Sequence, residues 1–158
     1  MSFHHDPAAW LRLAQENHCA YCQKDDDPAH SSTLKLFTYS ELCAHPRVCL
    51  KGTCYLISRQ HYVELFDLGE AALLGFMQEA QVAARVLKDV TGAFRINYEI
   101  HGNTIPHFHL HLFPRYLDDP FGGVSIDYAR VEPPVYAEGE FDRFVATMQA
   151  RLETVELS

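Results

Sequence analysis

The chain has 158 residues, of which 47% are hydrophobic, 22% charged and 12% aromatic, so it is long enough to form one globular domain with its own core. Its 21 acidic and 13 basic residues give a formal charge of −8, and no run of Lys or Arg interrupts this balance. The sequence therefore shows no cluster of positive charge that could bind the phosphate backbone of nucleic acid. The apolar stretches are shorter than the roughly 20 residues that span a bilayer, so we expect a soluble protein that does not enter membranes.

The cysteines and the amino terminus point to a reducing compartment. The first residues lack the basic and then apolar pattern of a secretory signal, so we expect a cytoplasmic protein, in which disulfides are rare. Of the five cysteines, only Cys19 and Cys22 have a spacing with a known chemical meaning. We predict that Cys43, Cys49 and Cys54 pack as small apolar side chains.

The first half of the chain predicts a short helix, a loop and three strands. Asp6 before Pro7 is typical of a helix N-cap, and the apolar residues that follow extend this helix to about Asn17. A polar, turn-rich segment at 23–33 predicts a loop. Three β-like runs follow, at residues 34–39, 48–50 and 53–58. We expect the last two runs to form a hairpin.

The second half predicts the main helix, a central pair of strands and a terminal helix. Apolar residues recur with helical spacing over residues 69–90. The segments 94–100 and 107–113 predict two strands that pair antiparallel. After an irregular stretch rich in Pro and Gly, helical spacing resumes over 141–155. Because no repeat or linker interrupts this order, we predict a single α+β domain over residues 1–158.

The strand predicted at 107–113 alternates imidazole and hydrocarbon side chains. Since strand side chains alternate between faces, His107, His109 and His111 share one face, with neighbours about 6.8 Å apart along the strand. The hydrocarbon residues of the opposite face are predicted to dock on the main helix, which fixes the register. The histidines are then directed toward a cleft.

The three histidines are separated by single apolar residues, and two apolar residues follow the last histidine. This pattern resembles the signature of the histidine triad (HIT) family of nucleotide hydrolases and transferases. The resemblance extends from about residue 19 to residue 116, and includes the segments 97–106 and 114–116 that flank the motif. It implies a HIT-like α+β fold, with an antiparallel sheet of about five strands, one long helix and terminal helices. It also implies a homodimer, for which the apolar stripe of the main helix offers a surface.

The resemblance implies attack on the α-phosphorus of a purine nucleotide or nucleotide conjugate, as in phosphoramidases and dinucleoside polyphosphate hydrolases. His109 would be the nucleophile and would form a covalent nucleotidyl-histidine intermediate that water resolves. A neutral imidazole suits this role near pH 7. His111 would donate a hydrogen bond to the phosphate in the transition state. Asn97, Asn103 and Thr104 match family positions that hold the phosphate or the leaving group.

One position departs from the family pattern. Family members commonly carry an acidic residue that binds the ribose hydroxyls about seven positions before the glycine that matches Gly52. The chain has His45 there, followed by Pro46. The sequence therefore does not predict how the nucleoside is recognised, nor which base is preferred.

Cys19 and Cys22 are spaced so that two thiolates can chelate one zinc ion, which needs two further ligands. A thioredoxin-like redox motif has the same spacing but lies between a strand and a helix, whereas here a helix precedes the cysteines and a polar loop follows. HIT proteins that contain zinc, and the similar hexose-phosphate uridylyltransferases, add a histidine after the second hairpin strand and the first triad histidine. The resemblance therefore implies His61 and His107 as the other ligands of a structural zinc.

Other assignments stay open at the level of the sequence. His18 and His45 are competing zinc ligands. The three triad histidines could instead hold a catalytic metal whose bound water attacks the substrate, as in metal-dependent hydrolases. Because His45 replaces the acidic residue that binds the ribose in the family, the chain could also be a protein that binds a nucleotide and does not turn it over.

Overall fold

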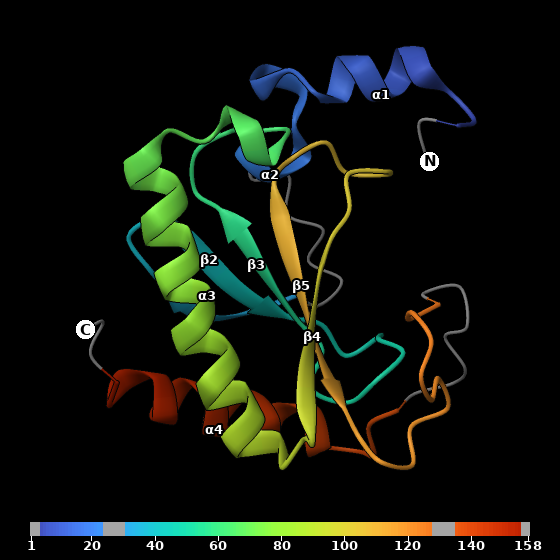
Figure 1. The fold of residues 1–158 in the computed structure, drawn as a ribbon, viewed down its shortest axis with the longest axis vertical. Helices are drawn as coiled ribbons and strands as arrows, with labels where there is room; N and C mark the ends of the chain where they lie inside the picture. The colour runs from blue at the N-terminus through green and yellow to red at the C-terminus, as the bar shows by residue number, and fades with distance from the viewer. Residues whose placement is uncertain (1–3, 24–30, 128–134, 156–158) are drawn as a thin grey trace.

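A five-stranded antiparallel sheet, with the strand order β1-β2-β3-β5-β4, is the centre of the structure (Figure 1). The structure is a computed structural model and describes residues 4–23, 31–127 and 135–155. The strands are β1 (Ser32–Leu36), β2 (Ser40–Ala44), β3 (Cys54–Ser58), β4 (Arg95–Ile100) and β5 (His109–Arg115). The helices are α1 (Pro7–Leu13), α2 (Ala20–Gln23), α3 (Glu70–Thr91) and α4 (Glu140–Glu153), with single 3₁₀ turns at Glu16–His18 and Leu65–Asp67. The architecture confirms the predicted α+β class and HIT-like arrangement.

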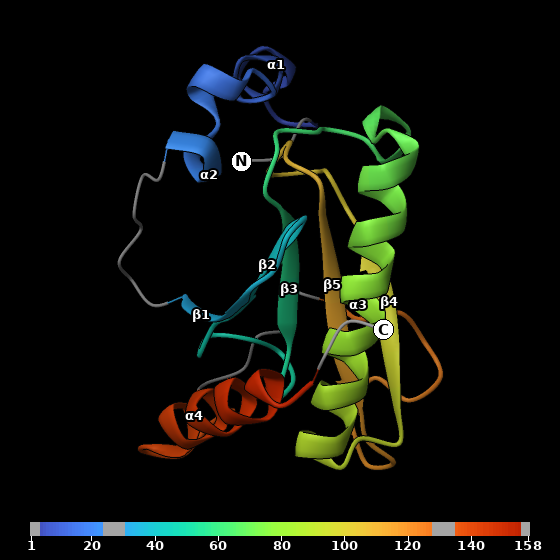
Figure 2. The same cartoon turned by 90° about the vertical axis from the view of Figure 1, so that its left-hand side faces the viewer.

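Helix α3 covers one face of the sheet along its length (Figure 2). Phe76 of α3 packs against Phe108, with ring centroids 5.0 Å apart, and Leu110 and Leu112 of β5 belong to the same buried core. The hydrocarbon residues between the histidines therefore face the main helix, as predicted. None of the described helices is long and apolar enough to cross a membrane.

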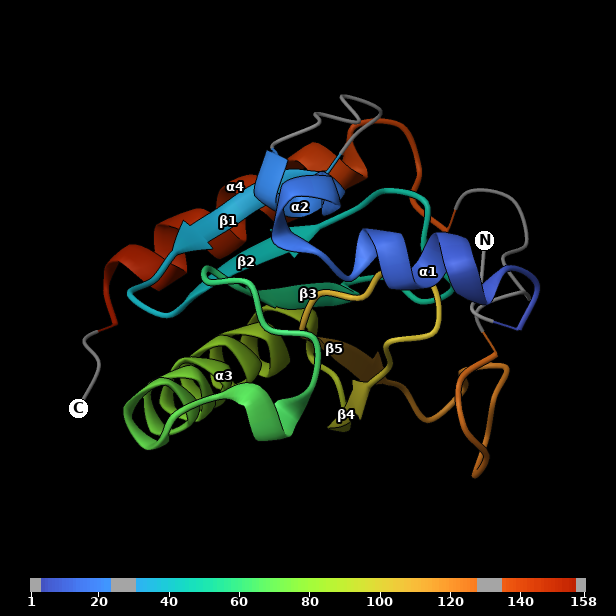
Figure 3. The same cartoon turned by 90° about the horizontal axis from the view of Figure 1, so that it is seen from above.

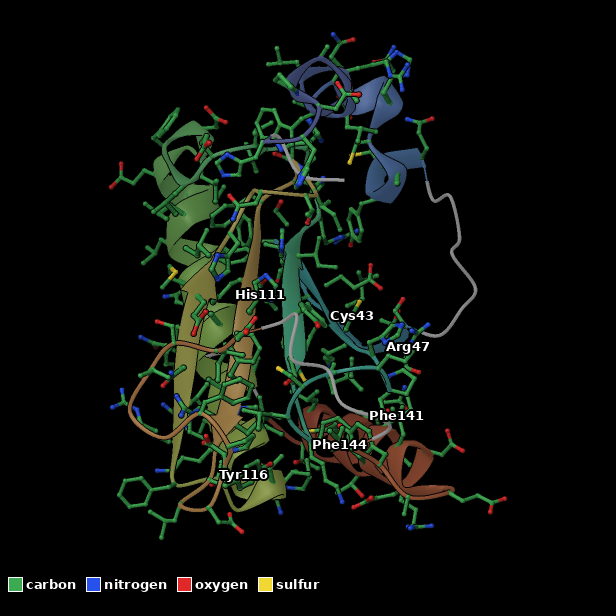
Figure 4. All side chains as sticks on the ribbon, turned by 90° about the vertical axis from the view of Figure 1, so that its right-hand side faces the viewer. Cys43, Arg47, His111, Tyr116, Phe141 and Phe144 are labelled. Carbon is green, nitrogen blue, oxygen red and sulfur yellow. The ribbon has the colours of Figure 1, made fainter. Side chains whose placement is uncertain are left out.

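The other helices lie at the two ends of the sheet. Helix α4 packs near α3 and β1 at one end, where Met148 and Leu152 enter the core and Phe141 and Phe144 border it (Figures 1 and 4). Helices α1 and α2 lie at the opposite end (Figures 1 and 2), and they are nearest the viewer when the structure is seen from that end (Figure 3). Trp10 of α1 fixes this arrangement, because its Nε1 donates a hydrogen bond of 2.8 Å to the Gly102 carbonyl between β4 and β5.

The predicted first helix is confirmed at its start and is wrong at its end. The Asp6 carboxylate accepts a hydrogen bond of 2.8 Å from the Ala9 N–H, as an N-cap does. The α-helix stops at Leu13 and a separate 3₁₀ turn follows, so it does not continue to Asn17. Most of the loop predicted at 23–33 lies outside the described residues.

The strand predicted at 34–39 is confirmed over residues 34–36, which belong to β1, and is wrong from Phe37 onward, where the chain leaves the strand. The chain turns after β1, with the Phe37 N–H donating to the Ser40 carbonyl at 2.9 Å, and β2 then begins. A buried carboxylate on α3 stabilises this turn. Glu79 accepts hydrogen bonds from the Tyr39 N–H at 2.8 Å and from the Ser40 hydroxyl at 2.6 Å.

The hairpin predicted between 48–50 and 53–58 is also wrong. Residues 48–50 form no strand, with Cys49 and Leu50 in a bend, and the hairpin partner of β3 is β2, with Leu42 opposite Leu56. Val48 is nevertheless only 3% exposed, and its two successors are buried as well. The apolar run at 48–50 therefore reflects burial and not strand pairing.

The three isolated cysteines are confirmed as buried packing residues. Cys43 of β2 and Cys54 of β3 are buried in the sheet, and Cys49 lies in a smaller cluster with Leu50, Phe113 and two residues of the segment that follows β5. All five cysteines are free thiols.

Candidate active site and metal centre

Strand β5 carries His109 and His111 on the face of the sheet opposite α3. The pairing register places Tyr55 of β3 and Glu99 of β4 directly beside His111. Side chains opposite one another in an antiparallel pair lie on one face, so these four residues define what we call the histidine face. The His111 ring lies 4.8 Å from the His109 ring and 5.0 Å from the Tyr55 ring, centroid to centroid. Figure 4 views this face, with α3 behind the sheet.

His107 does not continue this row, which corrects the prediction that the strand begins there. Strand β5 begins at His109, and His107 lies just before it, 1% exposed. Its Nε2 donates to the Ser58 carbonyl at 2.7 Å, and its Nδ1 lies 3.3 Å from the Cys19 Sγ and 3.5 Å from the Cys22 Sγ. The first triad histidine therefore belongs to a different cluster from the other two.

That cluster, which we call the zinc quartet, consists of Cys19, Cys22, His61 and His107. Its four ligand atoms, two Sγ and two Nδ1, all lie within 4.8 Å of one another. The His61 Nδ1 is 3.3 Å from both the Cys22 Sγ and the His107 Nδ1. A tetrahedral zinc with Zn–N of about 2.0 Å and Zn–S of about 2.3 Å separates its ligand atoms by about 3.3 to 3.7 Å. The four separations that involve a histidine Nδ1 given above, 3.3 to 3.5 Å, fit this ion, and no other such cluster occurs in the described parts of the chain.

Both histidines of the zinc quartet are held in the tautomer that a metal ligand needs. The His61 Nε2 donates to the Ala14 carbonyl at 2.8 Å, and the His107 Nε2 donates to the Ser58 carbonyl. Because a carbonyl only accepts, the proton lies on Nε2 and the lone pair on Nδ1. Two lone pairs that face each other at 3.3 Å repel unless a cation lies between them. The donor set therefore fits zinc.

Neither competing histidine enters the zinc quartet. His18 is exposed at the end of its 3₁₀ turn. His45 lies beyond the end of β2, where its Nδ1 accepts a hydrogen bond of 2.9 Å from the Arg47 N–H.

Burial raises the pKa of Cys22 to about 12, with a further contribution from its hydrogen bond to Cys19. A bound zinc ion reverses this effect, because it stabilises the thiolate.

Burial favours the neutral form of both His109 and His111. Burial lowers the pKa of His109. Burial, aided by the neighbouring imidazoles, lowers the pKa of His111 to about 3. The His109 Nδ1 donates a hydrogen bond of 2.6 Å to the His107 carbonyl, so its lone pair lies on Nε2. This arrangement provides one oriented nucleophilic nitrogen beside a second neutral imidazole.

The three predicted phosphate or leaving-group residues fall into two places. Asn97 lies on β4 opposite Phe113, and therefore on the histidine face. Asn103 and Thr104 are exposed in the connection between β4 and β5. The structure therefore brings Asn97 to the face of His109 and His111 and places the other two on the segment that leads into His107.

Three residues on or next to the histidine face were not predicted as site residues. Tyr55 lies beside His111, and burial raises its pKa to about 12. Glu99 and His101 are hydrogen-bonded, with 3.0 Å between Oε2 and Nε2, and the His101 ring centroid lies 5.4 Å from that of His111. The sequence carries one signal for Glu99 and His101. They are two residues apart at the end of a predicted strand, and residues with this spacing share a face.

The sequence model of the HIT domain family matches residues 38–118, slightly more than half of the chain. The chain belongs to the HIT family. Members of this family are in general nucleotide-binding hydrolases or transferases. Together with the zinc quartet, this match confirms the predicted resemblance to the HIT proteins that carry an amino-terminal zinc motif. A search of curated protein sequences finds no match to this HIT protein.

Solved structures of HIT proteins share the fold. A histidine triad protein from Bradyrhizobium japonicum is 21% identical, with a TM-score of 0.67 over 82% of this chain and 93% of its own. A zinc-bound histidine triad family protein from Mycobacterium smegmatis is 19% identical, with a TM-score of 0.64 over 88% and 96%. A hypothetical histidine triad nucleotide-binding protein from Sulfolobus tokodaii is 16% identical, with a TM-score of 0.65 over 85% and 90%. At these identities the likeness concerns the fold.

Proposed function

We propose that this HIT protein hydrolyses or transfers a nucleotidyl group through a covalent intermediate on His109. The hydrogen bond from the His109 Nδ1 to the His107 carbonyl, 2.6 Å long, carries this proposal. It fixes the ring and leaves the Nε2 lone pair as the nucleophile. Because burial lowers the pKa of His109, the ring is neutral at pH 7 and able to attack an α-phosphorus.

The remaining predicted residues have roles around this nucleophile. His111 is the preorganised hydrogen-bond donor to the phosphate oxygens, because its ring lies beside His109. Asn97, on the same face, also binds the phosphate, and Asn103 and Thr104 hold the leaving group. The substrate class is a purine nucleotide or nucleotide conjugate, cleaved as in phosphoramidases or dinucleoside polyphosphate hydrolases.

Zinc has a structural role in this proposal. Cys19, Cys22, His61 and His107 would hold the ion, which neutralises two thiolates and fixes the ring of His107. The zinc-bound state of the Mycobacterium smegmatis protein supports this assignment. The residues themselves join the amino-terminal segment to the start of β5.

A catalytic metal held by the three triad histidines has less support. The His107 Nδ1 is directed to the cysteines, and its Nε2 is hydrogen-bonded to Ser58. The His109 Nδ1 is engaged by the carbonyl of His107. These bonds direct the first two triad rings to different partners, so the geometry favours a nucleophilic His109 over a shared metal.

Trapping the intermediate tests the proposed function. Wild-type protein, His109→Ala and the control His18→Ala are mixed with an AMP conjugate labelled at its phosphorus, quenched, and examined for label on the protein. We expect acid-labile label on wild type and on the control, whose side chain is exposed, and none on His109→Ala. A His109→Ala variant with normal turnover contradicts the proposal. Nucleotide binding by wild type without any turnover indicates a binding protein instead.

A further inference from the structure

Glu99 and His101 form a carboxylate–imidazole pair at the end of β4, next to His111. Oε2 of the carboxylate lies 3.0 Å from Nε2 of the imidazole, and the two side chains are 18% and 35% exposed. The register places Glu99 opposite His111, and the His101 ring meets the His111 ring edge-on, at 82° and 5.4 Å. A carboxylate that holds one ring nitrogen fixes the ring and directs the other nitrogen, which is the arrangement used for proton transfer in hydrolytic sites.

The main chain next to His101 is also held by a hydrogen bond. Trp10 donates from Nε1 to the carbonyl of Gly102, the residue after His101, at 2.8 Å. Glu99 holds the side chain and Trp10 holds the main chain. The His101 ring is therefore positioned before a substrate arrives, as a group that acts in a transition state must be.

Departure of a leaving group from phosphorus requires a proton unless the leaving group is a stable anion. Burial lowers the pKa of His111 to about 3 and raises the pKa of Tyr55 to about 12, so neither group exchanges a proton readily near pH 7. In the described parts of the chain, two imidazoles are in ring contact with His111. One is His109, the proposed nucleophile, and the other is His101.

We propose that His101, oriented by Glu99, is the general acid that protonates the leaving group. This inference rests on the proposed nucleophilic role of His109. In the first step the His109 Nε2 forms a bond to phosphorus, the bond from phosphorus to the leaving atom breaks, and that atom takes the proton of the His101 Nδ1. In the second step water attacks phosphorus and gives a proton to the His101 Nδ1. The nitrogen–phosphorus bond then breaks, which restores both imidazoles and releases a nucleoside monophosphate.

Two AMP esters of similar size but different leaving groups test this role. The p-nitrophenyl ester releases a stable anion, whereas the p-methoxyphenyl ester needs a proton. We expect His101→Gln to lower kcat/KM for the p-methoxyphenyl ester about a hundredfold, the usual contribution of general acid catalysis, and to leave the p-nitrophenyl ester within about threefold of wild type. Glu99→Gln should show the same selectivity with a smaller loss, because the ring remains but its orientation is weakened.

The matched control is His18→Gln, which removes an exposed histidine outside the site and should change neither rate. Zinc content and melting temperature of each variant show whether the fold is intact. Equal losses of His101→Gln on both esters, or no loss on the p-methoxyphenyl ester, overturn the general-acid role. A wild-type protein that cleaves neither ester overturns the proposed nucleotidyl transfer, and the role of His101 with it.

Discussion

The carboxylate of Glu79 accepts a hydrogen bond from the Ser40 hydroxyl at 2.6 Å, inside the core and between elements that the sequence keeps far apart. Glu79 is 1% exposed and also accepts from the Tyr39 N–H. We expect Glu79→Ala to lower the free energy of unfolding by about 3 kcal/mol, because it leaves buried donors without an acceptor. Chemical denaturation measures this loss. The control is Gln78→Ala, an exposed change on the same helix, and equal stability of the two variants would contradict the role of Glu79.

Zinc content is the next prediction. The purified protein should hold close to one zinc per chain, and Cys19→Ser, Cys22→Ser or His61→Ala should lose it, because removal of one ligand opens a four-ligand site. Elemental analysis and melting temperature, with His18→Ala as control, check this. A metal-free wild-type protein of full stability would refute the zinc assignment.

His111 and His107 should respond differently to removal. His111→Ala should retain measurable turnover, with a loss of about 3 kcal/mol in transition-state stabilisation, as expected for one preorganised donor. Its zinc content should stay normal, because its ring lies beside His109 and not in the zinc quartet. His107→Ala should lower zinc content, stability and activity together. Equal loss of zinc in both variants would instead favour a metal held by the triad histidines.

The ion pair of Arg115 and Asp119 predicts a dependence of stability on pH. The Arg115 Nε donates to the Asp119 carboxylate at 2.7 Å, and this hydrogen bond holds the pKa of Asp119 below its ordinary value of 3.8. Because the pKa of Asp119 is lower in the folded than in the unfolded chain, its carboxylate stabilises the folded protein at pH values above 3.8. This stabilisation is lost as the pH falls through the pKa of the folded state. Thermal unfolding from pH 7 down to pH values of about 2 should show this loss in wild type and less of it in Asp119→Asn. Identical acid profiles would exclude the effect.

We also predict a homodimer. Strand β4 is one edge of the sheet. Tyr98 and Ile100 of this strand are 54% and 47% exposed, and Phe94, just before it, is 67% exposed. An edge strand with exposed apolar side chains is suited to pair with a second copy. Sedimentation at micromolar concentration should show a dimer, which Tyr98→Asp weakens and Leu11→Asp, a change of an exposed apolar residue on α1, does not. A wild-type monomer at that concentration counts against the pairing.

The sequence predicted the elements whose local signals agree with the fold. Helix α3 was expected at 69–90 and runs from Glu70 to Thr91, because its apolar periodicity matches the face that it buries. Strand β2 was missed. It contains Glu41 and Ala44, which have weak strand propensity, and it forms because β1 and β3 pair on either side of it.

The candidate site was predictable where a motif with fixed spacing carries it. The four residues assigned to zinc do meet in one cluster, although they come from three separated segments. The separation of His107 from His109 was not predictable, because strand alternation places both on one face, whereas the structure begins β5 only at His109. The pair of Glu99 and His101 could not be assigned to the site from the sequence, because only the pairing register of β4 and β5 places Glu99 beside His111.

The central pairing of β3 with β5 also bears on how the chain folds. Tyr55 lies opposite His111, yet all of α3 and β4 lie between them in the sequence. Bringing such distant segments together costs loop-closure entropy and slows folding, whereas α3 and the β4–β5 hairpin depend on nearer contacts. We therefore expect the histidine face to be assembled late, so that a refolding chain regains its helical signal before His109 and His111 are in position.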